Sequence, residues 1–154
     1  MATRISAEFT LTGTGFNPDE VTSFLGIHPA KTWRKGDLVD PRTLPRYKHD
    51  GWKLSAGYKE LDEENAVNLS NLVLDIFHKL QPHTSRLKVV CEKYKLAAEL
   101  TCVMYIEGND RPEMHFDHDV VKWLAELNAE TDLDLHVLPK QTRRKRRVKA
   151  GKRK

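Results

Sequence analysis

The chain has 154 residues, of which 39% are hydrophobic and 31% are charged, and its formal net charge is +4. This length fits one domain of about 140 residues with a short additional segment, and such a domain buries enough surface to fold without a metal or a disulfide. The sequence shows neither a signal sequence nor a run of about 20 apolar residues, so we expect a cytoplasmic protein that has no membrane partner.

The first two elements are predicted from alternation and from capping residues. Apolar and polar side chains alternate over residues 4–12, which is typical of a strand that buries one face. A helix over about 18–25 follows, because Asn17 suits its N-cap, Pro18 suits its first position and Gly26 suits a left-handed end.

The next part of the chain is predicted to be a long loop, a short strand and the longest helix. Residues 27–51 mix prolines, aromatic residues and charges without a sustained period, which indicates an ordered loop. Alternation at 52–57 predicts a second strand. The acidic residues at 60–64 suit the positive end of a helix dipole, and an apolar stripe then continues to the stop at Pro82.

Five further elements follow from the same patterns. They are a helix capped by Thr84 or Ser85, a central strand at 98–107, a brief strand at 114–116, a helix that begins near Asp117 or Asp119, and a last strand at 133–137. The order of all the elements predicts an α+β domain over residues 1–139, in which a mostly antiparallel sheet has its helices packed on one face.

Five segments in this order resemble the bacterial domain-of-unknown-function family 4279. They are residues 16–22, 25–29, 33–37, 50–55 and 121–134, and the resemblance covers nearly all of 4–138. It implies the fold rather than a reaction, because the family has no established reaction and only an association with toxin-immunity and accessory loci. Asn128 stands where the family pattern has glycine, and the ending around His136 also departs from that pattern.

A loop rich in aromatic and charged residues is the candidate site of the body. A Trp face can stack on a planar or cationic group, and an Arg side chain can hold a carboxylate or a phosphate. The alternative is structural, with the two Trp side chains plugging the sheet edge and local ion pairs tying the loop down. The candidate residues for a protein partner or a ligand are Trp33, Arg34, Lys35, Asp37, Arg42 and Trp52.

Signatures of catalysis are missing, so we predict a protein that is not an enzyme and has no catalytic residues. The sequence lacks a nucleophile elbow and a phosphate-binding glycine loop. The histidines and aspartates of 115–119 have metal-ligand types, but no second ligand group with a recognisable spacing accompanies them, so neither a metal nor another cofactor is assigned. Cys91 and Cys102 fall within apolar patterns and are interpreted as small buried side chains.

The last segment, residues 140–154, contains ten basic residues and no acidic one. The other 16 basic residues and all 22 acidic residues lie in 1–139, so this body has a formal charge of −6. We predict that the segment is a disordered, flexible tail, because its like charges repel and it has little apolar surface to bury. Its cations, which we predict to contact RNA or DNA phosphates, are Lys140, Arg143, Arg144, Lys145, Arg146, Arg147, Lys149, Lys152, Arg153 and Lys154.

Three functional hypotheses follow. The leading one is a non-enzymatic adaptor or accessory protein, whose basic tail contacts nucleic acid or a nucleoprotein assembly and whose acidic body binds a protein partner. The second is an immunity-like inhibitor, whose acidic body binds a basic toxin or nuclease. The third is a small-molecule binder or enzyme that uses the loop at 33–42. The tail can alternatively serve as a solubilising segment or fold back on the acidic body.

Overall fold

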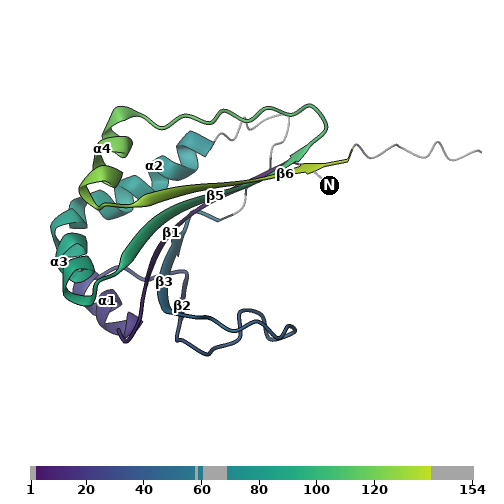
Figure 1. Cartoon of the computed structure of the whole chain (residues 1–154). Coiled ribbons are helices and arrows are strands. Elements are labelled where there is room, and N and C mark those ends of the chain that lie inside the picture. The colour runs from purple at the N-terminus through teal and green to yellow at the C-terminus, as the bar shows by residue number, and fades with distance from the viewer. Residues whose placement is uncertain (1–2, 58, 61–68, 140–154) are drawn as a thin grey trace, which may run out of the picture.

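The computed structural model describes residues 3–57, 59–60 and 69–139. Within these ranges the chain forms one six-stranded sheet, four α-helices and one 3-10 turn, arranged as in Figure 1. In chain order the elements are β1 (Arg4–Gly13), α1 (Pro18–Leu25), β2 (Lys31–Trp33), β3 (Asp50–Ser55), β4 (Lys59–Glu60), α2 (Leu69–Leu80), η1 (Gln81–His83), α3 (Thr84–Tyr94), β5 (Ala97–Glu107), α4 (His118–Glu126) and β6 (Glu130–Leu138).

The strands are arranged in the order β2-β3-β1-β5-β6, and the short β4 pairs with the beginning of β1. Neighbouring strands are antiparallel except for β5 and β6, which are parallel. A parallel pair needs a crossover connection, and α4 lies in the connection between these two strands. The predicted α+β class and the mostly antiparallel sheet are therefore confirmed.

The hydrophobic core lies between one face of the sheet and the helices. The apolar side chains of β1 that alternate along the strand, from Ile5 to Leu11, are fully buried, as are those of Leu100 and Cys102 on β5. Trp123 of α4 contributes an indole whose ring centre lies 5.7 Å from that of Phe9. The helices cover this face, as predicted, and the opposite face of the sheet turns toward the long loop at 34–49 (Figure 1). We name that opposite face the open face.

Local signals in the sequence placed α1 correctly. The Asn17 side chain accepts a hydrogen bond from the Asp19 N–H at 3.0 Å, and Gly26 ends the helix with a φ of 71°. Asn128, where the family resemblance leads us to expect glycine, has a φ of 51° and so occupies the left-handed region. Asn is one of the few side chains that tolerate this conformation.

Three predicted elements need correction. The loop predicted at 27–51 contains a short strand, β2, whose three residues are too few to show a period. Glu60, predicted to open a helix, lies instead in β4 and pairs with Arg4, while the rest of the acidic opening at 61–64 lies outside the described residues. The strand predicted at 114–116 is absent from the described chain, because this segment runs without a neighbouring strand and hydrogen-bonds to the start of α2.

In the part of the chain that the structure describes, no helix combines the length and the apolar character that crossing a membrane requires.

Candidate functional site

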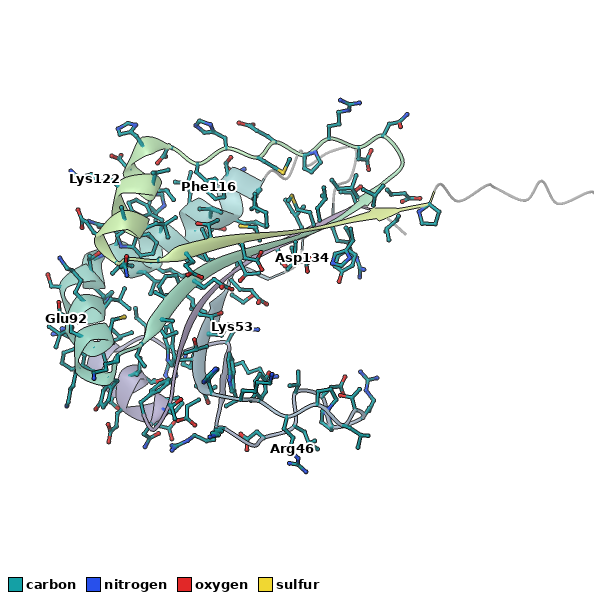
Figure 2. The ribbon with its side chains drawn as sticks, in the orientation of Figure 1. Arg46, Lys53, Glu92, Phe116, Lys122 and Asp134 are labelled. Carbon is teal, nitrogen blue, oxygen red and sulfur yellow. The ribbon has the colours of Figure 1, made fainter. Side chains whose placement is uncertain are left out.

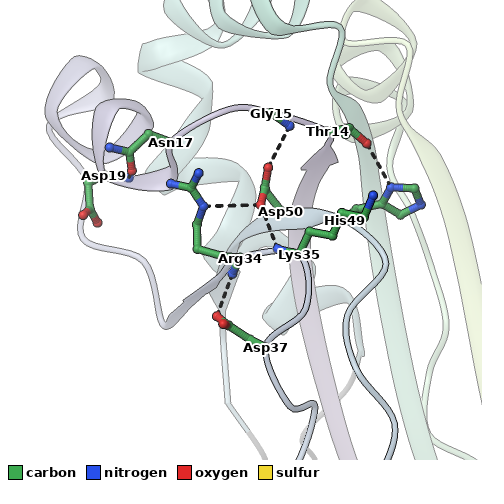
Figure 3. Close-up of polar contacts among 9 residues, drawn as sticks. All are labelled: Thr14, Gly15, Asn17, Asp19, Arg34, Lys35, Asp37, His49 and Asp50. Carbon is green, nitrogen blue, oxygen red and sulfur yellow. Dashed lines mark hydrogen bonds and ion pairs between the residues drawn. The ribbon is translucent and has the colours of Figure 1, made fainter.

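Asp50 is the centre of a hydrogen-bond network at one end of the sheet (Figure 3). It is the first residue of β3 and its side chain is buried. One carboxylate oxygen accepts the Gly15 N–H at 2.8 Å, and the other accepts the Lys35 N–H at 2.8 Å and contacts the Arg34 Nε at 3.3 Å. The carboxylate therefore joins the turn after β1 to the start of the long loop.

The environment of Asp50 keeps its carboxylate charged. Burial by itself raises the pKa of Asp50, but the hydrogen bonds from Lys35 and Gly15, the charge of Arg34 and a hydrogen bond from Phe16 outweigh it, so the pKa is lower than usual. A buried carboxylate saturated by backbone N–H donors is well suited to hold a loop in place. The same donors leave it poorly suited to act as a general base.

Trp33, at the end of β2, lies flat on the backbone of β3. A Cβ atom at Gly51 would come within 2.0 Å of the Trp33 ring carbons, so glycine is required at this position. The Tyr47 ring stacks on the indole with 4.6 Å between ring centres, and the Lys53 ammonium lies 5.6 Å from the indole centre. These contacts bury Trp33 to 8% exposure, so little of its surface is left for a ligand.

The other residues of the predicted loop site have different surroundings. Asp37 accepts the Arg34 N–H at 2.8 Å, and Arg42 pairs with Asp40 on the protein surface at 3.1 Å. Lys35 is exposed and contributes its backbone N–H to the network of Asp50. The structure therefore brings Arg34, Lys35 and Asp37 together, and it leaves Lys35 and Arg42 accessible to a partner.

Trp52 is separated from that group, although it is adjacent to Gly51 in the sequence. Its side chain points into the core, where it is fully buried and its Nε1 donates to the Thr22 hydroxyl of α1 at 3.0 Å. A ligand at the loop cannot reach this indole without opening the core. Whether the rest of the loop is a site remains a prediction.

The open face carries charges that are sorted across the sheet, a feature that the sequence analysis missed. At the β2–β3 side, Lys31 of β2 lies opposite Lys53 of β3 in the strand register. The Lys53 Nζ lies 3.1 Å from a carboxylate oxygen of Glu8. Figure 2 shows Lys53 and Asp134 on the side of the sheet away from Phe116 and Lys122. Basic side chains thus occupy the β2–β3 side of this face.

Four carboxylates occupy the other side, and we name them the acidic stripe: Glu99, Glu130, Asp132 and Asp134. Alternation along β5 and β6 places all four on the open face, because the residues between them point toward the helices. Glu99 lies opposite Glu130, and like charges placed opposite each other disfavour the free sheet. The signal was present in the alternating acids of 130–134, but only the pairing of β6 with β5 shows that they join Glu99.

Beside the acidic stripe, Tyr105 and His136 stack at the end of the sheet. Their ring centres are 4.6 Å apart, and the Arg4 guanidinium lies 4.8 Å from the Tyr105 ring centre. The His136 Nε2 also lies 3.0 Å from an oxygen of Asp134. This cluster fixes the side chains of β6 on the open face.

A groove with a volume of about 640 Å³ lies between α1 and α3. Exposed Phe24 and Val89 form its apolar wall, and the Tyr94 hydroxyl donates to Glu20 at 2.7 Å beside them. Such a surface can accommodate an apolar side chain.

The two cysteines are free, and burial makes both unreactive. Desolvation, with a smaller contribution from Glu92, raises the pKa of Cys91 to about 11. Desolvation, with a smaller contribution from Asp132, raises the pKa of Cys102 to about 12. Because the thiolate is the nucleophile, both thiols are poor candidates for catalysis.

The residues of 115–119 serve the fold. The Asp117 carboxylate caps α4 by accepting the Val120 N–H at 2.9 Å, and the backbone of His115 exchanges hydrogen bonds with the Ser70 hydroxyl. Among the residues that the structure describes, no group of three or more His, Cys, Asp or Glu side chains is placed to hold a metal ion. The predicted nucleic-acid-binding segment, 140–154, lies outside the described residues.

These features define the class of the protein as an α+β domain with one helix-covered face and one open face on which charges are sorted. The chain belongs to the family described as "Domain of unknown function (DUF4279)", whose profile matches residues 3–138. The predicted family resemblance is thereby confirmed. Comparison with curated proteins gave no match, and comparison with solved structures gave none either.

Proposed function

We propose that this protein is a non-enzymatic adaptor whose basic segment, 140–154, contacts nucleic acid and whose acidic body binds a basic protein surface. The observation that carries the proposal is the separation of charge along the chain. Ten of the 26 basic residues lie in the last fifteen positions, whereas 1–139 has a formal charge of −6. One chain thus offers two surfaces of opposite sign.

The basic segment supplies affinity for phosphates. Each Lys or Arg that meets a phosphate releases a condensed counterion, so binding by ten cations is tight at low salt and weakens steeply as salt rises. The segment contains no aromatic side chain on which a base could stack. Contact with the phosphate backbone, rather than reading of single-stranded bases, is therefore the expected mode.

The acidic stripe gives the body a surface for a basic protein partner. Asp132 and Glu130 are exposed at the edge of the sheet, and neither forms an ion pair with another residue that the structure describes. Complementary charge steers a partner to such a surface and fixes its orientation. The same stripe favours a second candidate function, an immunity-like inhibitor whose acidic face occupies a basic toxin or nuclease.

The nucleic-acid part is tested by titrating a labelled 30-mer RNA, and a duplex DNA of the same length, with three forms of the protein. They are the intact chain, a chain that ends at residue 139, and a full-length variant in which the ten cations of 140–154 are replaced by glutamine. We expect measurable affinity for the intact chain alone, with a steep salt dependence. Equal affinity of all three forms would exclude the segment as the binding element.

The protein part is tested by affinity purification after nuclease treatment, with the chain that ends at 139 and with the same chain carrying Glu130→Gln, Asp132→Asn and Asp134→Asn. A direct basic partner should bind the first and be lost from the second. Recovery of a toxin or nuclease whose activity the tailless body inhibits would favour the immunity-like function. Equal recovery by both forms would rule out the acidic stripe.

A further inference from the structure

No strand of the described residues pairs with the outer edge of β6. Figure 1 shows β6 at the edge of the sheet opposite β2, with β5 as its neighbour. The strand is nine residues long, and every residue from Glu130 to Val137 is exposed. The outward-facing N–H and C=O groups of this edge have no neighbouring strand within the described ranges. A row of such groups is a template for another strand.

The side chains of β6 do not protect this edge in the usual way. Proteins commonly protect an exposed edge strand with charged side chains, above all lysine, with proline or with a bulge. β6 carries acids on its open face but neither lysine nor proline, and its face toward the helices carries Leu133, Leu135 and Val137, which are 50%, 51% and 71% exposed. The pairing register with β5 is uninterrupted from Glu130 to Leu138. The strand is therefore long, regular and apolar on one face.

We propose that β6 pairs antiparallel with β6 of a second copy of this chain, about a two-fold axis at Leu135. The two sheets then form one continuous sheet. A two-fold interface brings the same patch of both copies together, so each favourable pair occurs twice. This inference goes beyond the proposed function and does not depend on it.

The side chains of β6 select this register. With the axis at Leu135, Leu133 lies opposite the partner's Val137 on the helix-side face, and Leu135 lies opposite the partner's Leu135. On the open face Asp134 lies opposite the partner's His136. Directly opposed pairs of complementary side chains stabilise an antiparallel pair, and this register contains no opposed like charges within β6.

The two registers shifted toward the start of β6 are worse. With the axis at Asp134, that carboxylate faces its own copy across the axis. With the axis at Leu133, Asp132 faces the partner's Asp134. Like charges opposite each other are destabilising, so the charges of β6 act against both alternatives.

The other occupants that this edge would fit are residues 140–154 of the same chain and an extended peptide of another protein.

The first test is sedimentation equilibrium of the full chain over a range of about 1 to 200 µM, a span that detects micromolar association. We expect a concentration-dependent shift from the 17.8 kDa monomer to a dimer of twice that mass. Leu135→Lys should weaken the dimer at least about tenfold, because it places two like charges at the axis. Val121→Lys is the matched control, since Val121 is 53% exposed on α4, and it should leave the dimer unchanged.

The second test uses complementation. His136→Asp should weaken self-association because it places two carboxylates opposite each other, and Asp134→Lys should weaken it because the lysine then has no carboxylate opposite it. An equimolar mixture should recover the dimer, since the lysine at position 134 of one copy then faces the aspartate at position 136 of the other. The pair that Asp134 forms with His136 within one chain is broken in both variants and cannot account for recovery.

Three results would overturn the proposal. The first is a wild-type chain that stays monomeric at 200 µM. The second is a dimer that Leu135→Lys weakens no more than Val121→Lys does. The third is protection of the β6 amides from hydrogen exchange that is independent of protein concentration and is lost on deletion of 140–154, which would assign the edge to the chain's own last segment.

Discussion

The two edges of the sheet differ in how they are covered. At the β2 edge, Trp33 lies on Gly51, Tyr47 stacks on Trp33, and Asp50 ties the long loop to the turn after β1. At the β6 edge, no strand or loop of the described residues covers the outer side of β6, and the aliphatic side chains Leu133, Leu135 and Val137 are at least half exposed. The β2 side of the sheet is held by contacts within the chain, whereas the outer side of β6 has no neighbouring strand among the described residues.

The comparison reverses the ranking of sites that the sequence suggests. Aromatic and charged residues draw attention to the loop at 33–42, yet most of them there serve to hold the loop on the sheet. The acids and aliphatic residues of β6 draw little attention in the sequence, yet they form the exposed surface. Residue type alone does not show which side chains are already occupied by partners in the same chain.

The largest expected effect at the β2 edge is that of Asp50→Ala. It leaves the partly buried N–H groups of Gly15 and Lys35 without their acceptor and removes the contact with Arg34, so we expect a loss of about 3 kcal/mol in the free energy of unfolding. Urea denaturation measures it. Asp40→Ala is the matched control on the same loop and should cost much less, because the hydrogen bonds and the ion pair that it loses with Arg42 lie at the protein surface.

Gly51→Ala should come next, with a loss of about 2 kcal/mol, because the added methyl group collides with the Trp33 ring. The cost should nearly vanish when Trp33→Ala is already present, since the colliding atoms are then gone. A double-mutant cycle by urea denaturation gives this coupling. An equal cost in both backgrounds would show that the indole does not lie on Gly51.

The pH dependence of Asp50 is a smaller effect. Its pKa in the folded chain is below the usual value of 3.8, so its contribution to stability is present above pH 3.8 and is lost as the pH falls through the lower, folded pKa. We therefore expect the stability difference between wild type and Asp50→Asn to shrink as the pH is lowered from about 5 to 2. Thermal denaturation at each pH measures this difference. A difference that grows on acidification would contradict the assigned hydrogen bonds.

The smallest expected effect is that of Arg42→Ala, at less than about 0.5 kcal/mol, because this side chain is exposed and pairs only with its neighbour Asp40. The variant is informative because it can lower the affinity for a ligand or partner without lowering the stability of the fold. If a ligand or partner uses the loop, Arg42→Ala lowers affinity at unchanged Tm. If both the Tm and the affinity are unchanged, the Arg42 side chain has no role in binding.

Much of the fold follows from the sequence. β1, α1, α3, β5, α4 and β6 were predicted because each has either strict alternation or an apolar stripe between clear start and stop residues. β2 and β4 were missed because strands of three and two residues have no period, and they form only because β3 and β1 offer an edge. The false strand at 114–116 arose because two apolar residues at that spacing resemble alternation.

Less of the candidate site could be predicted. The loop residues were identified, and the structural interpretation of Trp33 agrees with its burial, but the central role of Asp50 was not seen. A single aspartate before a strand has no sequence signature, because its donors come from Gly15 and Lys35, which are distant in the chain. The acidic stripe was missed for the same reason, since Glu99 joins β6 only through strand pairing.

Amide hydrogen exchange of the full chain at about 5 and 200 µM compares the two edges most directly, since these concentrations bracket a micromolar dissociation constant. The account predicts that the N–H groups of Gly15 and Lys35 are protected equally at both concentrations, and that the outward-facing amides of β6 become protected only at the higher one. Protection of β6 that does not change with concentration, or rapid exchange at Gly15 and Lys35, would contradict it.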